Sequence, residues 1–167
     1  MFYVTNSKFA AAKSDFVVLG TVSKIGPARW STGDGKRPLN PHLPTNIHSI
    51  FTPITIRIDE QIKGPQISQV EIQILAPFGS IDGDIYVTDD PRYEFTEGEK
   101  VLIYLKNVPS PPHEDLRRSM GETIWAIMER YTATSTQDQT SYSSKYETRK
   151  LEDLKREIEA APTEVQK

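Results

Sequence analysis

Six side chains suited to ionic or aromatic contacts gather in one segment of the sequence, residues 26–49. One is an indole ring and the others carry or can take up positive charge: Arg29, Trp30, Lys36, Arg37, His42 and His48. Tryptophan and arginine are enriched at the energetic centres of protein interfaces. Asp34 is the only acid in this segment, so we predict a positively charged binding loop. The alternative interpretation is that the ring covers one end of the core and the charges keep the loop soluble.

A second cluster, the aspartates between positions 82 and 90, is acidic and suggests a calcium site. EF-hand spacing does not fit, because Val87 and Tyr93 stand where that loop requires glycine and glutamate. Aspartates at turns on a solvated edge are the alternative interpretation. The chain has 3 histidines, His42, His48 and His113, and neither an HExxH motif nor a cysteine completes a zinc site with them. The sequence thus predicts no cofactor and no metal centre, with four weak calcium candidates, Asp82, Asp84, Asp89 and Asp90.

The catalytic motifs that we sought are missing. The chain contains no cysteine, which excludes disulfides, thiolate nucleophiles and cysteine-ligated metals. Asp59 and Glu60 are adjacent in an expected strand, so they point to opposite faces and cannot act together as a glycosidase pair. There is no GxSxG elbow, and the residues around Lys36 lack the P-loop pattern. We therefore predict a protein that is not an enzyme. A hydrolase whose site is assembled only in space remains the alternative.

The elements that must position these residues are short runs with alternating apolar residues, separated by turn signals. Such alternation is typical of antiparallel sheets. The first run is apolar on both faces and is expected to be central, and Gly20 inside it indicates a bulge, a bend or a close backbone approach. Residues 131–144 are predicted to be an exposed hairpin arm or a loop. Strands are predicted at 15–25, 50–62, 69–75, 85–88, 100–106 and 123–132.

Two helices are predicted, one near each end of the chain. The first covers residues 7–14, with Ser7 as its N-cap. The second covers residues 149–161, with Thr148 as its N-cap and Pro162 as its stop signal. An apolar stripe on the second helix should face the core, and it consists of Leu151, Leu154 and Ile158.

Length and composition are those of one soluble globular domain. The 167 residues are 37% hydrophobic and 26% charged, with a net charge of −3. This acidic balance argues against a nucleic-acid partner, and no stretch approaches the ~20 apolar residues of a membrane span. We predict a single domain over residues 1–167. It comprises a barrel core at 7–108 with the long loop 26–49, an added strand or hairpin at 109–148, and a C-terminal helix at 149–161.

Three segments of the sequence resemble the netrin-like module, the fold of the tissue inhibitors of metalloproteinases. Phe9 and residues 14–22 resemble its opening, where an aromatic and an acidic residue precede a valine-rich strand. Residues 58–64 resemble a strand-to-turn step that ends in Lys-Gly, and residues 97–103 resemble a glycine-containing turn into a core strand. The resemblance implies a five-stranded barrel of the oligonucleotide/oligosaccharide-binding (OB) type and an extracytoplasmic setting. The inhibitors place an N-terminal cysteine on the protease zinc. Because this chain has no cysteine, that mechanism is not carried over.

These observations together predict a mainly β protein, a small antiparallel OB-type barrel with a short N-terminal helix and a C-terminal helix. We expect a non-enzymatic binding module for a protein or polymer, extracytoplasmic if a leader was removed and otherwise cytoplasmic. Trp30→Ala or Arg37→Ala should then weaken binding without unfolding the protein. The further alternative is nucleic-acid or oligosaccharide binding on the barrel face, which requires exposed aromatic residues flanked by cations. The sequence does not indicate the oligomeric state.

Overall fold

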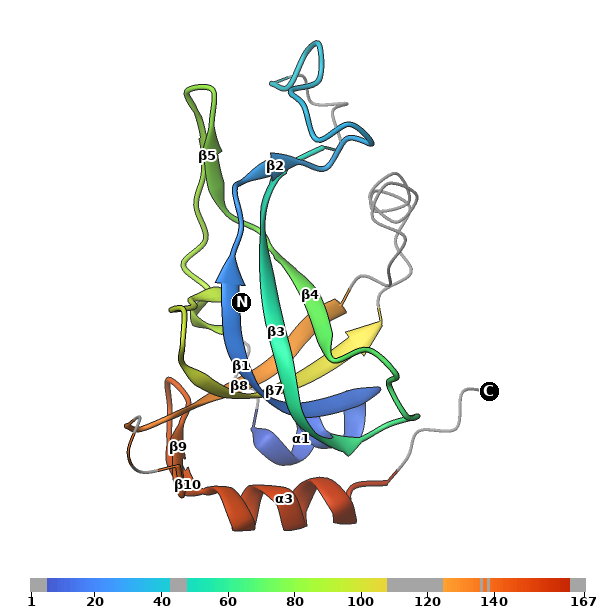
Figure 1. Ribbon diagram of the computed structural model, residues 1–167, viewed down its shortest axis with the longest axis vertical. Coiled ribbons are helices and arrows are strands. Elements are labelled where there is room, and N and C mark those ends of the chain that lie inside the picture. Colours follow the sequence, from blue (N-terminus) through green and yellow to red (C-terminus); the bar gives the residue numbers. More distant parts are fainter. Residues whose placement is uncertain (1–5, 43–47, 108–124, 136, 138, 163–167) are drawn as a thin grey trace.

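The protein is built on a curled antiparallel sheet, with helices at one end and loops at the other (Figure 1). The computed structural model describes residues 6–42, 48–107, 125–135, 137 and 139–162, so His113 and the first part of the predicted segment 109–148, up to residue 124, lie outside the described residues. The strands of the main sheet are β1 (Phe16–Ile25), β2 (Arg29–Trp30), β3 (Ile50–Lys63), β4 (Glu71–Ala76), β7 (Lys100–Asn107), β8 (Trp125–Ala133), β9 (Ser141–Ser143) and β10 (Thr148–Lys150).

The main sheet runs in the order β10-β9-β8-β7-β1-β3-β2, and β4 pairs with β3 off this path. A separate two-stranded sheet consists of β5 (Gly79–Ile81) and β6 (Asp84–Tyr86), followed by the 3₁₀ helix η1 (Pro91–Tyr93). Helix α1 (Ser7–Lys13) precedes the sheet and helix α3 (Leu151–Ala160) follows it. The mainly β, antiparallel class with two helices is confirmed. The strand pairings of the described residues do not close into a barrel.

Strand β1 lies between β7 and β3, as its two apolar faces predicted. Val17 and Val18 are both buried but belong to different clusters, because successive side chains on a strand point to opposite faces. The pairing of β1 with β3 shifts register between Leu19 and Gly20. A Cβ atom on Gly20 would lie 2.6 Å from the carbonyl oxygen of Arg57. Of the alternatives predicted for Gly20, the structure shows a register irregularity and a close backbone approach.

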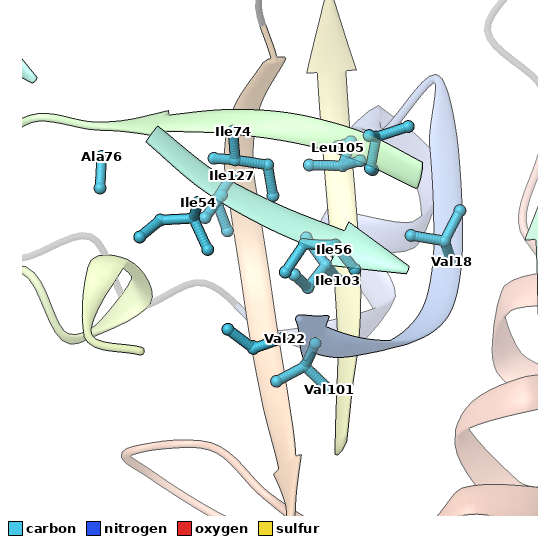
Figure 2. Packing of buried hydrophobic residues seen from close by; sticks show 11 residues of the cluster. Val18, Val22, Ile54, Ile56, Ile74, Ala76, Val101, Ile103, Leu105 and Ile127 are labelled. Atoms are coloured by element: carbon cyan, nitrogen blue, oxygen red, sulfur yellow. The ribbon is translucent and has the colours of Figure 1, made fainter. Parts of the chain in front are cut away.

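Two apolar clusters hold the fold together. Figure 2 shows the first, inside the curl of the sheet, where side chains of β1, β3, β4, β7 and β8 meet. The second lies between the sheet and the two helices. Leu151, Leu154 and Ile158 are all buried in this second cluster, which confirms the stripe predicted for the C-terminal helix.

Both helices exist where they were expected, but their predicted caps are wrong. Asn6 is the N-cap of α1, and its side-chain oxygen accepts a hydrogen bond from Phe9 N at 2.8 Å. Ser7 is the first helical residue instead. Thr148 belongs to β10, and α3 begins after Lys150 without a side-chain cap. Several neighbouring residues suit an N-cap position, so side-chain propensity alone does not fix the first residue of a helix.

The pairing of the expected strand at 85–88 needs a correction, whereas the expected hairpin arm is present. Residues 84–86 do form a strand, but it pairs with residues 79–81 in the separate sheet and not with the main one. The Ser- and Thr-rich stretch is a hairpin arm, because β9 pairs with β8 and then with β10. The β5–β6 hairpin and the residues that follow β2 lie at the end of the molecule opposite α1 and α3 (Figure 1).

Candidate binding site

The segment that follows β1 is an ordered turn in its described part. Trp30 N donates a hydrogen bond to Gly35 O at 3.0 Å. Asp34 Oδ1 accepts hydrogen bonds from Lys36 N at 2.9 Å and from Thr32 Oγ1 at 3.0 Å. The bond from the backbone of Lys36 and then that from Thr32 hold the pKa of Asp34 below its usual value. The Asp-Gly pair is therefore a turn that shapes the loop.

Two of the predicted binding residues, Arg29 and Trp30, contact this turn and hold its shape. The Arg29 guanidinium donates to Thr32 O at 3.1 Å and packs against Gly35. Trp30 is only 5% exposed, and its indole Nε1 has no hydrogen-bond partner within the described part of the chain. The alternative interpretation thus fits Trp30, whose ring covers an end of the core and is not offered to a partner. Trp30→Ala would remove a buried side chain and is no clean test of binding.

Arg37 joins the two clusters that the sequence suggested separately. Its Nε atom lies 2.6 Å from Asp84 Oδ2, and the Asp84 side chain is mostly buried. His42 Nε2 lies 3.7 Å from the other oxygen of the same carboxylate. A residue predicted for binding and a calcium candidate are therefore partners in one ion pair. This pair ties the loop to the β5–β6 hairpin.

The remaining loop residues are placed apart from this pair. Lys36 is exposed. His48 Nδ1 lies 3.1 Å from Ser31 Oγ, which also accepts a hydrogen bond from Ser49 N. A Ser–His contact is what the hydrolase alternative requires. Because Ser31 is only 2% exposed, its hydroxyl is screened from any substrate, and the contact does not favour catalysis.

The calcium candidates are not brought together as a ligand set. Asp82 lies in the hairpin turn, and Asp84 is bound by Arg37. Asp90 forms an ion pair of 2.6 Å with Arg92. In the described parts of the chain, no three acidic or histidine side chains are grouped so as to hold a metal ion.

An open apolar groove beside the β5–β6 hairpin is the feature that sequence reasoning missed. Its volume is about 420 Å³. Residues 85–87, at the end of β6 and just after it, line this groove. Ile85 is 72% exposed and Val87 is 79% exposed. Three consecutive exposed large apolar side chains are unusual on a soluble surface. The groove is lined by Phe78, Gly79, Ser80, Ile85, Tyr86, Val87, Thr88, Tyr93, Glu94 and Phe95.

The walls of the groove are anchored to the main sheet. Thr52 Oγ1 of β3 donates to Phe78 O at 2.7 Å, which holds the base of the hairpin. Arg92 Nη1 donates to Ile127 O of β8 at 3.1 Å, and this bond fixes η1. The guanidinium of Arg130 lies 4.6 Å from the centre of the Phe95 ring. The groove is therefore formed before any ligand arrives, which lowers the entropic cost of binding.

The stretch of chain that forms the hairpin and the groove is predominantly acidic. Arg92 is the only basic residue between positions 64 and 99. Burial alone raises the pKa of Asp90, but hydrogen bonds from the side chain and backbone of Arg92 outweigh it and hold the pKa below its usual value. Among the described residues, no salt bridge engages Asp82, Asp89 or Glu94. This stretch of chain therefore carries a net negative charge, and its Glu94 lines the groove in the electrostatic field of Arg130.

A signal for this site was present in the sequence, where residues 85–88 were predicted to form a strand with no partner assigned. Residues 85–87 are apolar, and such runs usually form buried strands. The Asp82-Gly83 turn that precedes them is typical of a two-residue hairpin, and it indicates that the partner strand is the short segment just before it. A two-stranded hairpin leaves the outer edge of each strand without a ladder partner, and this could have suggested exposure.

No family model matches the chain, and no curated protein is significantly similar to it. Neither of the two described helices is both long and apolar enough to cross a membrane.

Proposed function

We propose that the chain is a non-enzymatic binding module that engages a protein or polymer partner with the end of the sheet opposite the helices. The binding surface comprises the β5–β6 hairpin, the adjoining apolar groove and the described part of loop 26–49. The observation that carries this proposal is the exposure of Ile85, Tyr86 and Val87 beside an open groove. Apolar patches rimmed by polar residues mark interaction sites on soluble proteins.

The Arg37–Asp84 pair supports a joint surface rather than two independent loops. It connects residues that are 47 positions apart and holds the cationic loop beside the apolar hairpin. The resemblance to the netrin-like module also favours an interaction role for the chain. The hairpin would then supply the buried contact, and the loop would flank it.

Alternative functions receive less support. Strand-face binding of nucleic acid or sugar requires exposed aromatics along strands, and Tyr86 is the one strand residue among the exposed large aromatic side chains that the structure describes. The Ser31–His48 contact gives the hydrolase alternative no support, because the hydroxyl of Ser31 is buried.

Affinity capture from an extract of the source organism tests the proposal. The immobilised chain is compared with the double variant Ile85→Ser/Val87→Ser and with Val70→Ser, whose side chain is 75% exposed but does not line the groove. We expect a saturable partner that wild type and Val70→Ser retain and the double variant loses. The captured partner is then purified and its affinity measured by calorimetry. Equal affinity for all three proteins would refute this surface.

A further inference from the structure

The outer edge of β6 is open for strand pairing. Asp82 and Gly83 form the hairpin turn, with φ angles of +52° and +84°, which is the backbone of a type I′ two-residue turn. Ile81 and Asp84 flank it and are paired. In such a hairpin these two residues exchange backbone hydrogen bonds, so the next residue, Ile85, directs its N–H and C=O away from β5. Within the described residues, β6 pairs with β5 alone.

The edge of β6 is short, which is one form of protection, but it carries neither lysine nor proline. Natural edges carry lysine, proline or inward-pointing charges that discourage pairing with another chain. Here Ile85, Tyr86 and Val87 are all apolar or aromatic and exposed. The apolar groove lies beside the same residues. A strand added at this edge would therefore find both backbone partners and an apolar surface for alternate side chains.

The rim of the groove selects the charge of such a strand. Glu94 lines the groove, and the exposed acids Asp82 and Asp89 lie in the same stretch of chain. A second copy of this chain would bring two such acidic rims together, which disfavours pairing between copies. A cationic strand would instead be attracted.

We infer that β6 and its groove bind an extended peptide segment of alternating apolar and basic residues by strand addition. Main-chain hydrogen bonds to Ile85 supply affinity, and the groove and the acidic rim supply specificity. This inference rests on the proposed binding function and specifies the chemistry of the partner.

The test uses the full chain and a synthetic hexapeptide of alternating lysine and valine with blocked ends. We expect the peptide to bind, and at saturation to slow hydrogen exchange of the Ile85 amide by about tenfold or more, because that N–H becomes hydrogen-bonded. The same hexapeptide with glutamate in place of lysine should bind about tenfold more weakly. Calorimetry measures the affinities, and ¹⁵N NMR measures the exchange.

A pair of variants separates strand addition from simple filling of the groove. Ile85→Pro removes the outward N–H, a change that an edge strand tolerates, whereas Ile85→Val keeps it with a side chain of similar size. We expect affinity for the lysine–valine peptide to be about tenfold lower in Ile85→Pro than in Ile85→Val. The NMR spectrum of the main sheet verifies that both variants are folded.

Several results would overturn the inference. Equal affinity of the two variants, or unchanged exchange of the Ile85 amide, would mean that the groove takes a ligand without strand addition. Equal binding of the glutamate peptide would show that the rim does not select charge, and failure of the lysine peptide to bind would reject this partner chemistry. A natural partner that is still lost in Ile85→Ser/Val87→Ser would leave the proposed function standing in each case.

Discussion

Gly20→Ala should destabilise the protein at the centre of its sheet. A Cβ atom at this position would lie 2.6 Å from Arg57 O and 2.6 Å from Ile56 Cγ2, well inside the optimum of roughly 3.5–4.0 Å for heavy atoms. One of these contacts is with the backbone of β3, which is held by its pairing with β1 and β4. The strand therefore cannot yield as a flexible side chain would.

The magnitude follows from two opposing effects. Overpacking of a core costs about 1–3 kcal/mol, while replacing glycine by alanine stabilises by about 0.4–1 kcal/mol through the unfolded chain. We expect a net loss of about 1–2 kcal/mol in the free energy of unfolding. Urea denaturation followed by far-UV circular dichroism measures it.

Gly33→Ala is the matched control for this experiment. No atom lies within 4 Å of a Cβ at Gly33, so only the effect on the unfolded chain remains. We expect this variant to be as stable as wild type or slightly more so. If Gly20→Ala unfolded at the same urea concentration as Gly33→Ala, the close approach of β1 and β3 would be refuted.

Three further predictions concern the helix, the loop and pH. Leu154→Ala should lower the free energy of unfolding by about 2–5 kcal/mol, measured in urea, because Leu154 is fully buried on the inner face of α3. A loss below that range would contradict the packing of this helix. Arg37→Ala should cost at most about 1 kcal/mol, yet should speed amide exchange in residues 31–42 by releasing Asp84, and unchanged exchange would argue against the link. Because the pKa of Asp90 is lowered, its contribution to stability is complete above the ordinary value of 3.8 and is lost as the pH falls below it. An NMR titration should show that Arg92→Gln raises this pKa, and an unchanged value would refute the pairing.

Strand positions were predictable where every second residue is apolar and lies on a face that is buried in the structure. The expected strand at 50–62 is Ile50–Lys63, and the expected strand at 100–106 is Lys100–Asn107. Each has an apolar face in the first core cluster, so burial and local pattern favour the same structure. Residues 85–87 form an equally apolar run. Nothing in that run indicates which other strand pairs with it.

The candidate site was predictable only in part. The cationic loop was recognised from composition, but the burial of Trp30 depends on β2 pairing with β3. The salt bridge between Arg37 and Asp84 joins positions 47 residues apart. Such contacts arise from chain topology, which a local pattern does not encode.

The sequence by itself determined the antiparallel β class, the two helices, the central place of β1 and an irregularity of some kind at Gly20. These features follow from short-range periodicity and from the size of single residues, which act within a few positions of the chain. Only the tertiary structure decided that β6 stands apart with an open edge, that an acidic rim flanks an apolar groove, and that Arg37 closes on Asp84. Those features depend on which segments, distant in sequence, are in contact, and these contacts form only when the whole core packs.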